Sequence, residues 1–300
     1  MPRAITHFPS RSASFDINPN VHMFTEDVHL AVMPIGGRTE KHKEFSVILE
    51  GGNADCERVK QVLGSIGRHQ WPSVDELVCD VAETIALYLA WGGAAAFEIL
   101  IEENRATVLH NLTTRRLWRL PGCYLQVVPF SDWKVLKRRF AVIPAAQLWY
   151  VNMPGVLGGR FGHKTMLNRL GKCEILGPRF WRSDLERGKP ERHFDVREYV
   201  RNAHIYCGLL TKHWGWNRRD WSQEWSIEFF TFYKAITFHW AQAVLREHII
   251  AELNLLMVRL QIRCSVNVVG LPTSTEIMRV RNRLEEGTIS FGDAFDQVSM

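Results

Sequence analysis

The chain has 300 residues, of which 46% are hydrophobic and 23% are charged, close to the averages of globular proteins. Eleven tryptophans and 16 phenylalanines supply ample core material, which excludes disorder over the whole chain. The 21 glycines and 12 prolines follow no period, which excludes collagen-like and low-complexity classes. This length suits two modest domains or one elongated domain.

The chain contains no segment that predicts a membrane span. An uncharged run over 84–97 includes two glycines and is too short to cross roughly 30 Å of hydrocarbon as a helix. The polar N-terminus lacks the apolar core of a signal peptide, so we expect a protein without a membrane partner that is made in a cytosol. The six cysteines form no C-x-x-C pair, which argues for reduced thiols and against zinc or thioredoxin-type sites.

Positive charge is concentrated in the middle of the chain. Residues 105–182 hold 14 Lys and Arg but two acidic residues, a net of +12, and the rest of the chain holds 23 basic and 30 acidic residues, a net of −7. Like charges repel, so this separation needs a reason. Three reasons stay open: binding of a polyanion such as nucleic acid, docking onto an acidic neighbouring subunit, or a solvated basic face.

The first hundred residues predict mixed secondary structure. In chain order we expect a flexible arm over 1–20, short strands over 27–34 and 44–50, and a helix over 55–66. A clear helix then begins after Ser73, which forms a capping-box pattern with Glu76. Apolar residues follow at helical spacing until Gly92 and Gly93 end it.

From Ala94 to Val151 the pattern changes to strands separated by turns. The strand-like segments are AFEILI, ATVLHNL, CYLQVVPF, RRFAVIP and QLWYVNM. Several hairpins in about 55 residues predict a small antiparallel sheet that carries much of the basic charge. A glycine loop over 155–162 leads to a helix from about Lys164, and 183–193 is a polar linker.

Helices dominate the last third. The stretch between Gly215 and Gly270 contains neither Gly nor Pro, and a helix of about 39 residues there would be roughly 58 Å long. Six aromatics within 229–240 make it apolar around its circumference, so we expect it to be covered on most sides. A strand beginning at Cys264, a proline turn, a helix capped by Ser274 or Thr275 and stopped by Gly287, and a short amphipathic helix near Ser290 complete the chain.

No motif predicts a catalytic, metal-binding or cofactor-binding residue. GGRFGHKT is similar to a phosphate loop, but His163 separates Gly162 from Lys164 and moves the lysine out of register. The 12 histidines show no metal-ligand spacing, and no carboxylate pair stands out as an acid–base dyad. We therefore expect no enzyme activity, metal or cofactor, with an unrecognised active site as a further alternative.

The stretch HWGWNRRDWSQEW packs four tryptophans beside two arginines. Such residues can stack on bases or bind phosphates, and they also form interface hot spots. Because the stretch precedes the aromatic helix, we favour packing or subunit contact. The candidate subunit-interface residues are Trp214, Trp216, Trp221, Trp225, Phe229, Phe230, Phe232, Tyr233, Phe238 and Trp240. The candidate nucleic-acid-facing residues, chosen by charge clustering, are Arg115, Arg116, Arg119, Lys137, Arg138 and Arg139.

Three segments in order resemble parts of tailed-bacteriophage portal proteins, the head–tail connectors. ELVCDVAETIALYLAWGGAAAFEILI is similar to their helix, small-residue turn and strand. IPAAQLWYVNMPGVLGGRFGHKTMLNRL is similar to their strand, glycine loop and helix before the stem. RCSVNVVGLPTSTEIMRVRNRLEEGTISFGDAFDQV resembles their C-terminal part, where a strand and Leu-Pro lead into a helix ending in Glu-Gly. The chain is short for that family, and the long aromatic helix has no counterpart that can be aligned.

The resemblance implies a portal-like α+β fold, with a small antiparallel sheet plus long helices in an elongated subunit. It implies a flexible arm over 1–20, a wing-like α/β region with the basic sheet over 21–160, a stem-like helical region over 161–262, and a C-terminal strand–helix region over 263–300. Portal proteins are non-enzymatic homo-oligomeric rings, usually dodecamers, around a channel for double-stranded DNA.

The resemblance also implies a location and partners. A portal is a structural protein of the virion, made in the host cytoplasm and placed at one capsid vertex, where DNA is packaged and ejected. Its partners are itself, double-stranded DNA, the major capsid protein, terminase, and head-completion or adaptor proteins. The alternative hypothesis, from another class, is an accessory protein outside any ring that binds nucleic acid through the basic 105–182 segment.

Overall fold

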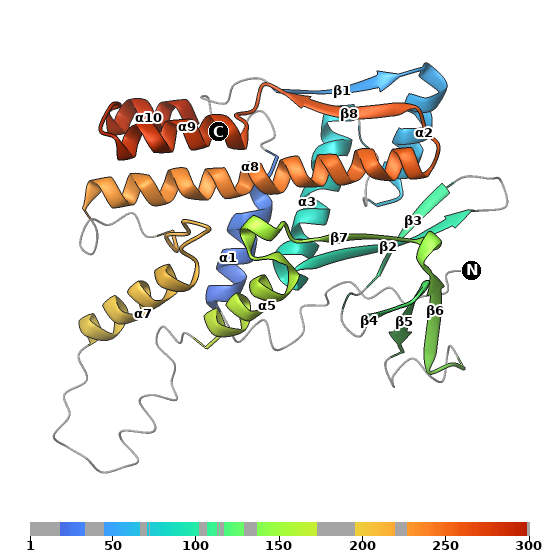
Figure 1. Cartoon of the computed structure of the whole chain (residues 1–300), viewed down its shortest axis with the longest axis horizontal. Helices are drawn as coiled ribbons and strands as arrows, with labels where there is room; N and C mark the ends of the chain where they lie inside the picture. Colours follow the sequence, from blue (N-terminus) through green and yellow to red (C-terminus); the bar gives the residue numbers. More distant parts are fainter. Residues whose placement is uncertain are drawn as a thin grey trace, which may run out of the picture.

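The computed structural model describes residues 19–33, 45–66, 71, 73–101, 107–112, 114, 117–128, 137–172, 196–219 and 227–298. The described chain combines helices with small antiparallel sheets, so the predicted α+β class is confirmed. Residues 1–18 of the arm predicted over 1–20 lie outside these residues, as does the linker over 183–193, and Pro19 and Asn20 belong to a helix, contrary to the prediction. Figure 1 shows α8 (Glu228–Arg259) crossing the molecule, with the other elements above and below it.

The remaining elements are short. The other helices are α1 (Pro19–Leu30), α2 (Asn53–Gly64), α3 (Val74–Gly92), α5 (Gly159–Leu170), α7 (Val196–Leu210), α9 (Ser274–Glu285) and α10 (Phe291–Val298), with 3-10 turns η2 (Ala145–Gln147) and η3 (Gly155–Leu157). The strands are β1 (Ser46–Gly51), β2 (Ala94–Ile101), β3 (Thr107–Leu112), β4 (Leu117–Leu120), β5 (Cys123–Val127), β6 (Phe140–Pro144), β7 (Leu148–Asn152) and β8 (Cys264–Val269).

The strands form three antiparallel sheets where one small sheet was expected. Their orders are β1-β8, β3-β2-β7 and β4-β5-β6. Strand β2 is buried on both faces because two layers cover it. Phe97 faces the main core with the helices, and Ala96 packs with Leu117 and Ile143 of the third sheet. The β3-β2-β7 sheet is therefore the middle layer between the helices and the β4-β5-β6 sheet.

The strand predicted over 27–34 is wrong, because residues 27–30 belong to α1. Val21, Phe24 and Val28 recur at helical spacing, and all three are buried in the main core. The stretch had too few residues to separate a helical period from an alternating one. Helix α1 packs against α3, and this contact positions the start of the chain's described part over the core.

Helix α3 has the ends that its sequence predicts. The Ser73 hydroxyl accepts a hydrogen bond from the Glu76 amide at 3.2 Å, and Gly93 ends the helix in the left-handed region at φ 70°. A Cβ at Gly93 would also approach the Arg160 carbonyl oxygen to 2.8 Å. Glycine at this position therefore allows both the turn into β2 and close contact with α5.

Helix α8 has 32 described residues and is about 48 Å long. It is shorter than the expected 39 residues, because it begins at Glu228; residues 220–226 lie outside the described part. It packs against α3, β8, α9 and α10, which covers most of its circumference, as its composition predicts. One main core runs through residues of all three predicted regions, and β8 pairs with β1 from the other end of the chain.

The C-terminal elements follow the predicted order with one correction. Thr273, and neither Ser274 nor Thr275, caps α9, and it forms a full capping box with Glu276. Gly287 has φ 68° and ends the helix as predicted. The Ser290 hydroxyl accepts a hydrogen bond from the Asp293 amide at 3.2 Å, and α10 begins at the next residue, Phe291.

Candidate interaction surfaces

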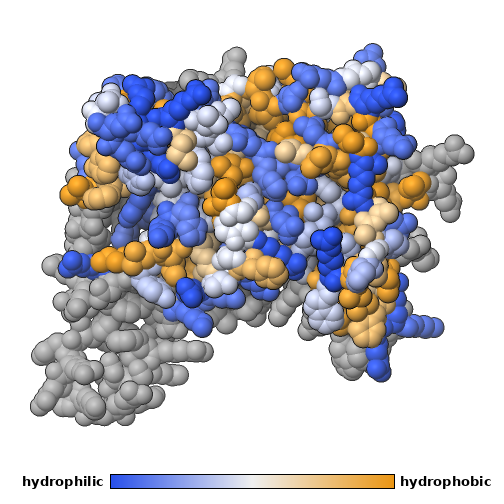
Figure 2. Space-filling view, in the orientation of Figure 1, coloured by the Kyte–Doolittle hydropathy of each residue, from blue (hydrophilic) through white to orange (hydrophobic). Residues whose placement is uncertain are grey.

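The β4-β5-β6 sheet exposes an apolar face to solvent. Strand pairing places Trp118, Leu125 and Val142 in one row, with side chains on the side of the sheet away from β2. The exposed fractions on this side are 55% for Trp118, 44% for Leu120, 53% for Phe140 and 55% for Val142. We call these four residues, with the half-buried Leu125, the outer face. Figure 2 shows apolar surface over this end of the molecule.

Local sequence accounts for this geometry. Leu117, Gln126 and Ala141 form the neighbouring row, and all three are buried toward β2. Tyr124 stacks on Tyr150 of β7 at 5.7 Å between ring centroids, which fastens the sheet to the middle layer. Gly122, at φ 75°, closes the tight β4–β5 turn. Strands β4 and β6 carry apolar residues on both sides of the sheet. One side packs against β2, so the apolar residues of the other side stay exposed.

Basic side chains flank the β4-β5-β6 sheet, and strand alternation places Arg119 and Arg139 on the side opposite to the outer face. Arg119 on β4 and Lys137 and Arg139 before β6 are exposed, and Arg138 is half-buried. The described residues from 107 to 172 include no Asp or Glu. The structure thus brings four of the six candidate nucleic-acid-facing residues to one small sheet, on both sides of β5. The other two, Arg115 and Arg116, lie outside the described residues.

The described tryptophans of the tryptophan-rich stretch pack against a helix of the same chain. Trp214 is 0% and Trp216 is 2% exposed, and both rings pack edge-to-face against Phe24 of α1, each at 5.3 Å between centroids. The Trp216 indole N–H donates to Asp27 at 2.8 Å. The prediction of these two residues as subunit-interface surface is therefore wrong, since the chain's own helix covers them. Trp221 and Trp225 lie outside the described residues.

An arginine completes this turn. The Arg219 Nε donates to an Asp27 oxygen at 2.6 Å, and its Nη2 donates to Glu26 at 2.8 Å. This guanidinium holds the pKa of Glu26 below its ordinary value, and the two carboxylates raise the pKa of Arg219. Residues 211–219, which we call the Trp turn, thus pack against α1 of the same chain.

Most of the aromatic residues at the start of α8 contact α9 and α10. Phe232 stacks on Phe291 at 5.7 Å, and Phe229 meets the same ring at 6.1 Å. The Arg281 guanidinium lies over the rings of Tyr233 and Trp240, at 5.8 and 5.7 Å. Phe238 packs against the main core. Among the described members of the predicted interface set, Phe230 alone is more than half exposed, at 53%.

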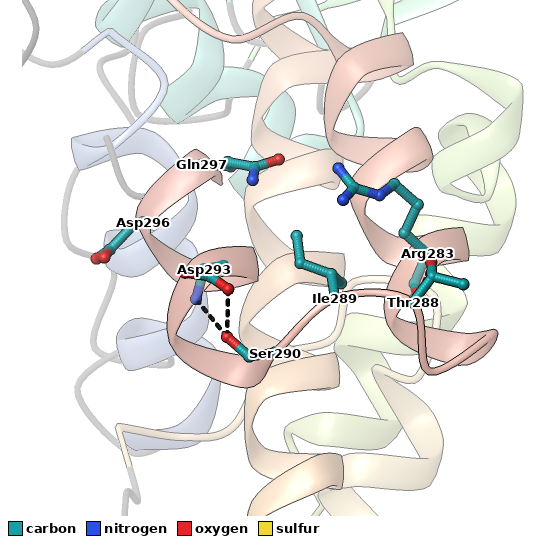
Figure 3. Close-up of a pocket in the computed structure, with 7 residues that line it drawn as sticks. All are labelled: Arg283, Thr288, Ile289, Ser290, Asp293, Asp296 and Gln297. Atoms are coloured by element: carbon teal, nitrogen blue, oxygen red, sulfur yellow. Dashed lines mark hydrogen bonds between the residues drawn. The ribbon is translucent and has the colours of Figure 1, made fainter.

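Two shallow hollows lie beside these helices. One, of about 580 Å³, has an apolar floor of Phe229, Leu284, Ile289 and Phe291, with Glu285 and Glu286 among its lining residues. The other, of about 370 Å³, is polar and includes Arg283, Asp293 and Asp296. Figure 3 shows its lining on α9, α10 and the connection between them, with Asp296 directed away from the centre. Both hollows include Ile289 and Ser290, so they adjoin. We call the pair the acidic hollow.

The glycine-rich loop supports the core. His163 is 1% exposed and its Nε2 lies 2.8 Å from the Ala90 carbonyl oxygen. Burial lowers the pKa of His163 to about 4, so the ring is neutral near pH 7. Helix α5 begins at Gly159, earlier than the expected Lys164, and Lys164 is exposed. His163 joins α5 to the end of α3.

Within the described ranges, no group of three or more His, Cys, Asp or Glu is placed to hold a metal ion. None of the helices in that part of the chain has the length and apolar character needed to cross a bilayer. No protein-family model matches the chain, and no curated protein matches it.

The outer face is the feature that sequence patterns missed. Strand β4 has four residues and was not predicted, although the alternating exposure of Leu117 and Trp118 is typical of a strand with one buried side. The segment FAVIP is apolar at every position, so its sequence does not indicate which side is covered. The sheet's tertiary contact with Ala96 and Leu148 decides that.

Proposed function

We propose that this protein is a structural, portal-type subunit that assembles into a homo-oligomeric ring and conducts double-stranded DNA at a capsid vertex. The observation that carries the proposal is the arrangement of the three segments that resemble portal proteins. They form α3–Gly93–β2, β7–η3–α5 and β8–α9–α10, in the local order that the resemblance implies. All three units pack around α8.

The basic segment supports a contact with DNA phosphates. Arg119, Lys137 and Arg139 are exposed at a sheet within the 105–182 segment, whose net charge of +12 favours contact with a polyanion. Contacts of this type position DNA without reading its sequence, which suits a channel through which any sequence passes.

The first test is particle mass, by light scattering and single-particle imaging. A ring of on the order of a dozen 34.7 kDa chains is expected from the resemblance. A chain that stays monomeric at micromolar concentration, with and without scaffold and capsid proteins, contradicts the proposal.

The second test is binding to double-stranded DNA across a salt series. The variant Arg119→Glu/Lys137→Glu is expected to weaken binding and to lower the slope of log K against log salt by about one for each lost phosphate contact. The matched control is Arg263→Glu/Arg279→Glu, which reverses two exposed charges outside the basic segment. Equal loss in both variants contradicts a DNA contact at the sheet.

One observation favours the second candidate function, a nucleic-acid-binding protein that forms no ring. Trp118 and Phe140 are both more than half exposed on the outer face, and exposed aromatic rings near arginines bind single-stranded bases by stacking. A monomer that binds single strands with a steep salt slope, and loses that binding on Trp118→Ala, would establish this alternative.

A further inference from the structure

The outer face is large for an exposed apolar surface on one small sheet. Its four exposed side chains leave on the order of 400 Å² uncovered, given about 150–250 Å² for a large aromatic side chain. Apolar patches of that size on soluble proteins often mark interaction sites. Three of the five residues, Leu120, Leu125 and Val142, are aliphatic. Aliphatic side chains favour packing against another protein surface over stacking with bases.

The acidic hollow has the complementary chemistry. Its floor is apolar, and its concave shape leaves room for side chains that project from a sheet. Four carboxylates, Glu285, Glu286, Asp293 and Asp296, line the hollow together with one basic residue, Arg283, so its net charge is negative. Glu286 and Asp296 are both exposed. The hollow carries a net negative charge, and the sheet that presents the outer face carries Arg119, Lys137 and Arg139, so the two regions have opposite net charge.

The two surfaces lie at opposite ends of one subunit. Figure 1, which has the longest axis horizontal, shows α9 and α10 at one end and the β4-β5-β6 sheet at the other. The two surfaces of one chain are therefore too far apart to meet. A second copy presents the same two surfaces, so the contact that satisfies both is head-to-tail between copies.

We infer that the outer face of one subunit docks on the acidic hollow of the next copy. This inference rests on the proposed ring and names the contact that builds it. Such a contact joins two different surfaces, so it leaves one of each free on every dimer and continues until a ring closes. It also assigns part of the basic charge to subunit contact.

Three variants test the contact. Val142→Glu places a negative charge on the outer face at a position 55% exposed. Glu286→Lys/Asp296→Lys reverses two exposed charges of the hollow near the C-terminal ends of α9 and α10, where lysine suits the helix dipole. The controls are Val258→Glu, at a position 74% exposed on α8, and Glu50→Lys on β1. Circular dichroism confirms that each variant is folded, and Trp118→Glu replaces Val142→Glu if that variant is not.

Particle mass is the readout, for each variant alone and for equal mixtures. Each docking variant alone is expected at the 34.7 kDa monomer mass, and both controls at the wild-type oligomer mass. The mixture of Val142→Glu with Glu286→Lys/Asp296→Lys is expected to associate into a dimer or a larger particle. One pair of intact surfaces remains between the two chains, and the other pair sets the introduced glutamate against the introduced lysines.

Each contrary outcome overturns a different claim. A wild-type ring whose mass is unchanged in both docking variants overturns the contact and leaves the ring. Variants that are monomeric alone and stay monomeric when mixed overturn the head-to-tail arrangement. A Val142→Glu variant that keeps its oligomer mass and loses DNA binding assigns the outer face to nucleic acid. A wild-type chain that is monomeric under every condition overturns both the contact and the proposed ring.

Discussion

The Trp turn and the outer face contain the same residue types in opposite settings. Trp214 and Arg219 belong to the turn, and Trp118 and Arg119 belong to the sheet. Trp214 is fully buried, but Trp118 is 55% exposed. The difference lies in the neighbours: α1 supplies Phe24 and two carboxylates to the turn, whereas no described element covers the outer face of the sheet. Tryptophan beside arginine therefore indicates an interaction, and the available partners decide whether it is internal or external.

Replacing a buried tryptophan of the turn gives the largest expected effect. Trp214→Ala removes a ring that packs against Phe24 and His163, so the free energy of unfolding should fall by about 3–5 kcal/mol. Urea titration followed by circular dichroism measures it. A loss below about 1 kcal/mol would show that the turn is not part of the core.

The next prediction compares the same substitution at one glycine in each region. Gly215 has φ 69°, and an added Cβ would overlap the Lys234 carbonyl oxygen and come within 2.6 Å of the Thr237 Cβ. Gly215→Ala should therefore cost about 2–4 kcal/mol, from both the left-handed backbone and the overlap.

The control is Gly122 in the β4–β5 turn. It has φ 75°, and nothing lies within 4 Å of an added Cβ. Gly122→Ala should cost only the backbone part, about 1–2 kcal/mol. Thermal unfolding of both variants measures the difference, and equal losses would contradict the tight contact of the Trp turn with α8.

The parts of the fold that sequence predicts are those with local signals. Ser73 and Gly93 bound α3, and Gly287 ends α9, because caps and left-handed stops depend on a few neighbouring residues. Helix α1 was missed in part because Val28 also suits a strand, and only contact with α3 favours the helix.

The candidate surfaces depend on contacts between distant residues. Burial of Trp216 requires Asp27, which lies 189 residues away in the sequence. The exposure of Val142 requires Ile143 to pack toward Leu148 in another sheet. Charge clustering selected the candidate nucleic-acid-facing residues, and the four described ones lie on or next to one sheet, but clustering contains no information about the apolar outer face of that sheet.

A smaller loss of stability is expected at acidic pH. Glu26 has a pKa below its ordinary value of 4.5, chiefly because it accepts a hydrogen bond from Arg219. This stabilisation is fully present above pH 4.5 and is lost as the pH falls through the lower folded-state pKa. Both side chains are partly exposed, so we expect about 0.2–1 kcal/mol. Urea titrations at pH 7 and pH 3 measure it, and Arg219→Met should reduce the pH dependence. An unchanged pH dependence in that variant would contradict the ion pair's role.

The smallest expected change in stability is the most informative about the outer face. Trp118→Ala removes as many atoms as Trp214→Ala, but more than half of the Trp118 side chain already contacts solvent, so little burial is lost. The free energy of unfolding of the dissociated chain should therefore change by no more than about 0.5 kcal/mol. Particle mass should fall in the same variant, because the docked state alone buries the ring. A large loss of stability in the monomer would mean that residues of the same subunit cover the outer face, and the sheet would then resemble the Trp turn.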